Sequence, residues 1–174
     1  TDLLDIQSPR AKRYVKRLME EKGFEKVVTG GGVEVLVPAP EVNLLLLSSH
    51  ILKHAFGVGI GLRQFCDYAV ARRYYEGRVN EEEMREIWRM TGLEKWQGLL
   101  EGFLVKKTGV LLDIVLKGGN FGVYSKDREN VPRARWARKV QTFRSLAGNV
   151  RFAFRYAPRE WFWTIVQLLG GQLR

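Results

Sequence analysis

The stretch that most constrains this fold is residues 48–70, where one amphipathic helix ends in a glycine-rich turn and a second helix begins. His50 and His54 are four positions apart, so a helix places both imidazoles on one face, with Lys53 beside them. Three glycines within residues 57–61 supply the permissive backbone that a chain reversal needs. The segment therefore predicts an αα-corner whose polar groups point inward.

Apolar residues in the helix after the turn recur at spacings of three and four, which predicts a buried face made of Leu62, Phe65, Cys66, Ala69 and Val70.

The helix after the turn also carries polar residues. Together with the two histidines they form what we call the polar corner: His50, His54, Arg63, Gln64 and Asp67. Arg63 and Asp67 can pair along the helix or reach across to the histidine helix. We expect both to be largely buried and bonded there, because charged side chains are rarely buried unless paired. On that expectation Asp67→Ala costs about 3 kcal/mol or more, because it strands a cation.

The histidine spacing also suits zinc, but two observations disfavour a metal site. Ile51 stands where the HExxH arrangement has its general-base glutamate, and the sequence shows no third ligand. A buried, hydrogen-bonded histidine pair is therefore favoured, with Arg63 and Asp67 as candidate partners.

Two glycine clusters predict turns rather than phosphate-binding loops. The run at 57–61 follows a helix, whereas a dinucleotide fingerprint follows a strand. Gly30, Gly31 and Gly32 join two β-branched runs, which predicts a β-hairpin over residues 24–37.

The remaining periodicities are helical. Ser8 and Pro9 mark a helix start, and Asn80 with Glu83 marks another. The helix over residues 41–56 is apolar on most sides, so we expect it to be central and buried. The sequence thus predicts a mainly α fold, a helical bundle-like array with one small β-hairpin near the N-terminus.

Composition limits the class of protein. A chain of 174 residues that is 45% hydrophobic can bury a real core. Cys66 is the only cysteine, which excludes an internal disulfide framework and favours a reducing, cytoplasmic compartment in which this thiol behaves as a core residue. Apolar runs are too short to span a bilayer, so we expect no membrane partner.

The net charge of +10 is uneven, since residues 126–159 hold ten Lys or Arg against two acidic residues. Arg144, Arg151 and Arg155 flank an apolar seam in this tail and are candidates for anion binding. The seam consists of Trp136, Val140, Phe143, Ala147, Val150 and Phe154. We expect it to pack on the helical core, and a final helix to start at Pro158.

The strings SHILKH, GIGLRQFCDYA, GGNFG and YAPRE, with the basic tail, resemble a bacterial nucleotidyltransferase-like family of uncharacterised proteins related to the polymerase-beta superfamily. The resemblance covers nearly the whole chain and corresponds to the C-terminal region of that family. It implies an N-terminal α/β catalytic domain, missing here, in which a Gly-Ser turn and paired aspartates hold magnesium and a nucleoside triphosphate. No such motif occurs in this sequence, so we expect no catalytic residues and no cofactor in this chain.

These observations divide the chain into four parts. Residues 1–38 form a helix and hairpin that link to the missing catalytic domain, and residues 39–117 form a helical core. Residues 118–132 form a glycine-rich loop, and residues 133–174 a basic helical tail packed on the core.

The loop contains Gly118, Gly119, Asn120, Phe121 and Gly122. At about 15 residues it is longer than most loops in compact domains, which raises the chance of a ligand contact. The alternative is that Phe121 closes a core edge while the glycines permit the turns.

Three functions stay open. The first is an accessory domain of a nucleotidyltransferase that shapes the acceptor or partner side of a cleft and is not catalytic alone. The second is a basic module that binds nucleic acid or another polyanion. The third is a structural protein-protein interaction domain whose apolar seam docks on its own missing half or on a second copy of the chain.

Overall fold

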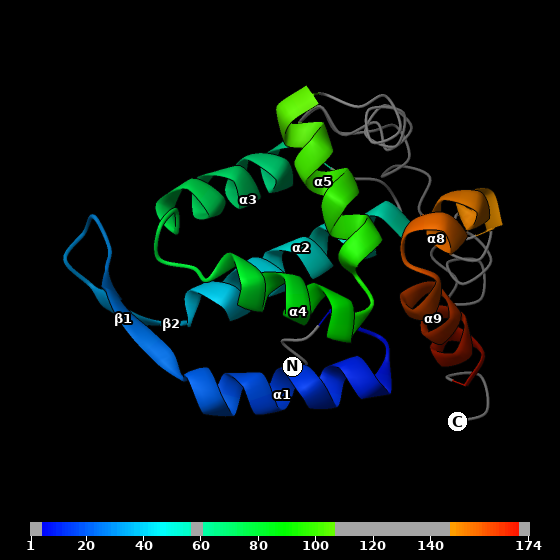
Figure 1. Cartoon of the computed structure of the whole chain (residues 1–174), viewed down its shortest axis with the longest axis horizontal. Coiled ribbons are helices and arrows are strands. Elements are labelled where there is room, and N and C mark those ends of the chain that lie inside the picture. The colour runs from blue at the N-terminus through cyan, green and yellow to red at the C-terminus, as the bar shows by residue number, and fades with distance from the viewer. Residues whose placement is uncertain (1–4, 57–60, 107–146, 171–174) are drawn as a thin grey trace, which may run out of the picture.

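The computed structural model describes residues 5–56, 61–106 and 147–170 (Figure 1). In this part of the chain the secondary structure consists of α1 (Pro9–Lys22), β1 (Phe24–Val28), β2 (Glu34–Pro38), α2 (Pro40–Phe56), α3 (Leu62–Tyr74), α4 (Glu81–Thr91), α5 (Glu94–Lys106), α8 (Val150–Tyr156) and α9 (Pro158–Gly170). The predicted fold class, mainly helical with a single hairpin near the N-terminus, is confirmed. No helix within these ranges is long and apolar enough to cross a membrane.

The helix α1 and the hairpin form where the sequence places them. The side chain of Ser8 caps α1 by accepting a hydrogen bond from the backbone N–H of Ala11. The strands pair in antiparallel fashion with Phe24 opposite Pro38, and Gly32 adopts a φ of 77° in the turn between them. The hairpin projects from the end of α1, away from the other helices (Figure 1).

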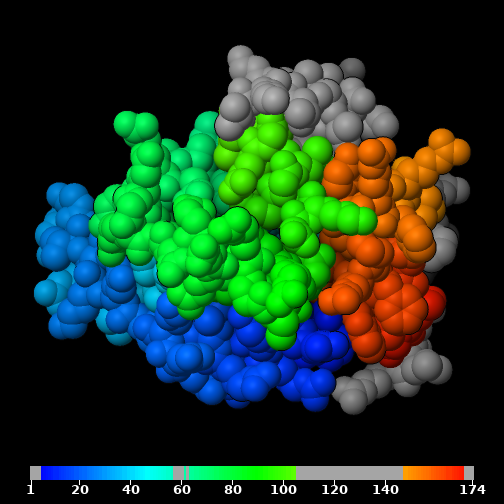
Figure 2. All heavy atoms as spheres, in the orientation of Figure 1, coloured from blue at the N-terminus to red at the C-terminus, as the bar shows by residue number. Residues whose placement is uncertain are grey.

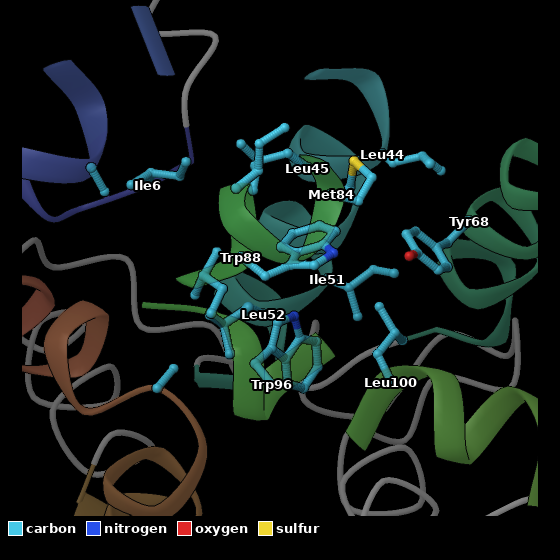
Figure 3. Packing of buried hydrophobic residues seen from close by; sticks show 14 of the residues in the cluster. Ile6, Leu44, Leu45, Ile51, Leu52, Tyr68, Met84, Trp88, Trp96 and Leu100 are labelled. Atoms are coloured by element: carbon cyan, nitrogen blue, oxygen red, sulfur yellow. The ribbon is translucent and has the colours of Figure 1, made fainter. Parts of the chain in front are cut away.

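The helix α2 lies at the centre of the molecule, as its nearly uniform apolar character predicts. It contacts α1, α3, α5 and β2. Leu45 and Ile51 are at most 1% exposed, and Ile51 and Leu52 lie among the indole rings of Trp88 and Trp96 (Figure 3). Burying such side chains contributes about 1.5–3 kcal/mol each.

The helix α3 is rotated relative to the predicted orientation. Its buried residues are Phe65 and Tyr68, at 2% and 1% exposure, while Cys66 is exposed. The amide of Gln97 on α5 donates a hydrogen bond to the Tyr68 hydroxyl, and this bond fixes the face that α3 turns inward. The prediction of a buried Cys66 is therefore wrong.

The helices α8 and α9 close the end of the molecule opposite the hairpin (Figures 1 and 2). The Phe152 ring on α8 contacts the Trp96 ring at a centroid distance of 6.0 Å. Val150 and Phe154, which belong to the predicted seam, are exposed, so Phe152 and Ala153 form the packed face instead. Seam residues 136–143 lie outside the described residues. The predicted start of the final helix at Pro158 is confirmed.

Candidate functional site

Four polar side chains gather where the N-terminal segment crosses α2, and we call them the histidine cluster: Asp5, His50, Lys53 and His54. Nδ1 of His50 lies 2.6 Å from Oδ2 of Asp5, and Lys53 donates to Oδ1 of the same carboxylate. Nε2 of His54 lies 3.2 Å from Nε2 of His50. Helical spacing on α2 brings the two imidazoles together edge to face, so a carboxylate, two rings and an ammonium form one connected network.

The order of hydrogen bonds in the cluster determines which nitrogen atoms carry protons. Ionised Asp5 only accepts, so Nδ1 of His50 donates to it and, in a neutral ring, Nε2 of His50 accepts. His54 must then donate from its own Nε2. A neutral His54 therefore carries its free lone pair on Nδ1, where it can receive a proton from a ligand.

Electrostatics favour this arrangement of charge. Burial would raise the pKa of Asp5, but hydrogen bonds and charges from Lys53 and His50 outweigh it and lower the pKa below its ordinary value. Burial, with the charges of His50 and Lys53, lowers the pKa of His54. Asp5 is therefore ionised and His54 neutral near pH 7.

A cavity of about 500 Å³ lies next to the cluster, between the N-terminal segment, α2, the start of α5 and α9. Its apolar wall is formed by Ile6, Leu52, Phe56, Leu93 and Leu168. Cavities of this size that are mainly apolar and have a few polar groups at one end are typical of small-molecule sites.

Polar side chains also line the cavity. From the N-terminal segment and α2 these are Asp5, Gln7, Ser49, Lys53 and His54, and from α9 they are Glu160, Thr164 and Gln167. Glu160 is only 4% exposed. Its carboxylate accepts hydrogen bonds from the backbone N–H groups of Gln7 and Ser8, so it closes the N-terminus of α1.

Burial is also the main influence on the pKa of Glu160. It raises the pKa of this carboxyl, and the backbone hydrogen bonds and the charge of Lys12 offset it only in part. Glu160 therefore presents no unpaired charge to the cavity, because its oxygen atoms already accept hydrogen bonds from backbone N–H groups.

The predicted polar corner is only partly correct. His50 and His54 come together, but they are half-buried and their carboxylate partner is Asp5. Arg63 and Asp67 are exposed on α3, so the prediction that they are buried and bonded with the histidines is wrong. The physical reason is the rotation of α3, which turns both charges toward solvent. Gln64 accepts a hydrogen bond from the N–H of Gly61 at 2.7 Å and helps to start α3.

Other predicted site residues stay untested. Gly118, Gly119, Asn120, Phe121, Gly122 and Arg144 lie outside the described residues. Arg151 and Arg155 are exposed on α8 and therefore accessible to an anion.

Sequence reasoning missed two carboxylates of the site. Asp5 is 45 residues from His50, and Glu160 is 152 residues from Ser8. Neither belongs to a recognisable motif. The one available signal for Glu160 was its position in the first turn after Pro158, which does not indicate a partner on α1.

The donor atoms in the described ranges do not fit a metal centre. No group of three or more His, Cys, Asp or Glu residues there could hold a metal ion. Both oxygens of Asp5 are bonded, to His50 and to Lys53, and those of Glu160 are bonded to backbone N–H groups. Magnesium, which the family resemblance implies, is not assigned to these residues.

Comparison with known proteins gives one match. The model of a family described as an uncharacterised nucleotidyltransferase matches residues 1–100. This range includes Asp5, both histidines and the whole of α2 and α3. No curated protein and no solved structure matches the chain.

Proposed function

This chain belongs to the uncharacterised nucleotidyltransferase family, and from that premise we propose that it is a C-terminal helical accessory domain of such an enzyme. Its role is to form the acceptor side of a cleft. The α/β catalytic domain of the same gene product is its partner and supplies the nucleotide site with magnesium. The chain alone does not transfer a nucleotide.

One observation carries this proposal: the histidine cluster lies at the border of the cavity, with His54 and Lys53 lining it. An acceptor group must lose a proton as it attacks phosphorus, and a neutral imidazole within reach can take that proton. The relay from His54 through His50 to Asp5 stabilises the charge that this transfer creates. Lys53 pairs with the carboxylate of Asp5 and balances its charge.

The test compares the natural gene product with this chain. Each is incubated with magnesium, α-³²P-labelled nucleoside triphosphates and the small-molecule fraction of the source cell. We expect labelled product from the whole protein and none from the chain. His54→Ala in the whole protein should lower the rate at least tenfold, as loss of a general base does, whereas Arg63→Ala, on the exposed side of α3, should not.

Calorimetry with magnesium and each triphosphate gives the complementary result. We expect the chain to bind no triphosphate tightly, because the two carboxylates of the cavity, Asp5 and Glu160, already have partners. A micromolar site on the chain, or transfer by the chain alone, would overturn the proposal.

A second function is favoured by a separate observation. Four cations of α1, namely Arg10, Arg13, Lys16 and Arg17, are exposed, as are Arg151 and Arg155 of α8. Exposed cations in such numbers suit weak binding of nucleic acid or another polyanion by phosphate neutralisation. The salt dependence of binding, described in the Discussion, tests this function.

A further inference from the structure

The cavity beside the histidine cluster also indicates the chemical class of its ligand. We propose that it binds a neutral, mainly apolar alcohol or phenol whose hydroxyl group donates a hydrogen bond to Nδ1 of His54. The idea that this ligand is the acceptor rests on the proposed function. Its binding to the cavity does not depend on that function.

The apolar wall sets the body of the ligand. Five side chains from four segments of the chain meet there: Ile6, Leu52, Phe56, Leu93 and Leu168. A ligand that covers them removes apolar surface from water at about 25 cal/mol per Å². A polar, hydrated molecule would lose its water without compensation at this wall.

The charges at the border favour a neutral ligand. Lys53 and Asp5 form an ion pair, so neither offers a full charge to a newcomer. Glu160 of α9 also lines the cavity and repels an anion whenever it is ionised. An amine would arrive as a cation beside Lys53. A charged ligand would therefore lose hydration while the charged groups of the cavity are already paired with one another or with backbone N–H groups.

The hydrogen bonds of His54 select a donor group. Its Nε2 faces His50 at 3.2 Å, which leaves Nδ1 as the ring nitrogen for a ligand. Among the described residues we find no hydrogen bond to that nitrogen. When His50 is neutral, its Nε2 accepts from Nε2 of His54, so Nδ1 of His54 accepts and cannot donate. A hydroxyl satisfies it, whereas an ether or a ketone does not.

The experiment uses matched fluorescent probes on the chain itself. 2-Naphthol has an apolar body and one hydroxyl, 2-methoxynaphthalene lacks the donor, and 2-naphthoate carries a negative charge. We expect 2-naphthol to bind saturably and about fivefold more tightly than 2-methoxynaphthalene, as one net hydrogen bond gives. The binding of 2-naphthoate should be weaker still. Titrations at pH 7.5 followed by naphthalene fluorescence measure the three Kd values.

Two variants separate the polar and apolar contributions. His54→Phe removes the acceptor but keeps a ring, so 2-naphthol should lose its preference while 2-methoxynaphthalene binds as before. Leu168 is half-buried on α9, and Leu168→Trp should fill part of the cavity. We expect it to weaken the binding of both probes about tenfold or more. Arg63→Gln, exposed on α3, is the matched control and should change neither Kd. Circular dichroism melts confirm that each variant is folded.

The outcomes are distinct. Absence of saturable binding, equal affinity for the methyl ether, or a preference that survives His54→Phe overturns the ligand class. If His54→Phe does not fold, His54→Gln tests the same point. Its amide oxygen should preserve part of the preference for 2-naphthol, and the control Arg63→Gln should preserve all of it. The chain could bind 2-naphthol through His54 while the whole protein transfers nucleotides at a normal rate without His54. That result would support the binding site and refute its role as the acceptor site. If the whole protein depends on His54 but no alcohol probe binds the chain, the ligand class falls and the proposed function stands.

Discussion

Glu160 in the first turn of α9 accepts a hydrogen bond from the backbone N–H of Ser8, the N-cap of α1, at 3.1 Å. The carboxylate thus joins the last described helix to the first. It satisfies N–H groups that the start of a helix leaves without partners, and its negative charge faces the positive end of the α1 dipole. One contact therefore holds α9, and with it one wall of the cavity, against the N-terminal segment.

Removal of this carboxylate should destabilise the whole domain. Glu160→Ala leaves the N–H groups of Gln7 and Ser8 buried without an acceptor, so we expect a loss of about 2–3 kcal/mol in the free energy of unfolding. Glu160→Gln should cost less, because its amide oxygen still accepts. Urea unfolding followed by circular dichroism measures both. Glu20→Ala, an exposed residue of α1, is the control and should stay within about 0.5 kcal/mol of the parent chain. An equal loss in Ala, Gln and control variants would contradict this role.

The same residue predicts how stability depends on pH. Because burial raises the pKa of Glu160 in the folded state, the folded chain binds this proton more tightly than the unfolded chain. The contribution is fully present below the unfolded pKa of about 4.3 and is lost as pH rises through the folded value. The stability of the parent chain relative to Glu160→Gln should therefore fall as pH rises above about 4.3. A constant or rising difference would contradict the prediction.

Asp5 should show the opposite dependence. Its folded pKa is lowered by Lys53 and His50, so its stabilising effect is present above the unfolded pKa of about 3.9 and is lost as pH falls through the folded value. The pair with Lys53 is partly exposed, so Asp5→Asn should cost less than about 1 kcal/mol at pH 7. The cost should decrease as pH falls below about 3.9. The exposed Asp67 offers a matched control, and Asp67→Asn should have no comparable effect.

Local sequence signals were sufficient to predict most elements of the fold. Ser8 with Pro9 begins α1, and Asn80 begins α4 by accepting hydrogen bonds from the N–H groups of Glu82 and Glu83. The three glycines before Val33 give the hairpin its turn. These features depend on residues within four positions of one another, so the sequence carries them directly.

The orientation of α3 could not be predicted in the same way. Cys66 and Val70 lie on one stripe of this helix and Phe65 and Tyr68 lie on another, and both pairs have helical spacing. Packing against α2 and the bond from Gln97 of α5 select the second stripe. That choice turns Arg63, Cys66 and Asp67 to solvent. The loss of about 3 kcal/mol expected for Asp67→Ala therefore no longer follows, and we expect a change within about 0.5 kcal/mol.

The site was predictable only where its residues are close in sequence. The four-residue spacing of His50 and His54 indicates that the rings share a face, and the structure places them 4.5 Å apart between centroids. Asp5 and Glu160 reach the site through tertiary packing over long sequence separations, which no local pattern encodes.

A buried polar network between α2, α3 and α5 should be strongly stabilising. Ser48 donates to the Gln97 side-chain oxygen at 3.0 Å, and the Gln97 amide donates to the hydroxyl of Tyr68, whose pKa burial raises to about 12. Gln97→Ala leaves two buried hydroxyls without this partner and should cost about 2–4 kcal/mol. Tyr68→Phe should cost about 1 kcal/mol alone and less in the Gln97→Ala background, because the shared bond is already lost. Urea unfolding of the four members of this cycle checks the coupling. Additive costs would contradict it, and Lys95→Ala on the exposed side of α5 is the control.

The exposed arginines of α8 should bind polyanions in a manner that depends on salt. Arg151 and Arg155 are both exposed, and Arg144 lies nearby in the sequence but outside the described residues. For true phosphate neutralisation, log K falls with log salt by about 0.9 per phosphate on duplex DNA and about 0.7 on a single strand. Fluorescent single-stranded and duplex oligonucleotides, titrated at two salt concentrations, measure this slope.

Replacement of Arg144, Arg151 and Arg155 together by Gln should flatten the slope by about 2 to 3 phosphate equivalents. The matched control replaces Arg63, Arg73 and Lys95, which are exposed on α3 and α5 and remove the same charge. If both triple variants flatten the slope equally, the effect reflects net charge rather than a site on α8. Absence of binding at low salt would contradict the polyanion function, and the tail would then be better explained as a docking surface for the catalytic domain of the same protein.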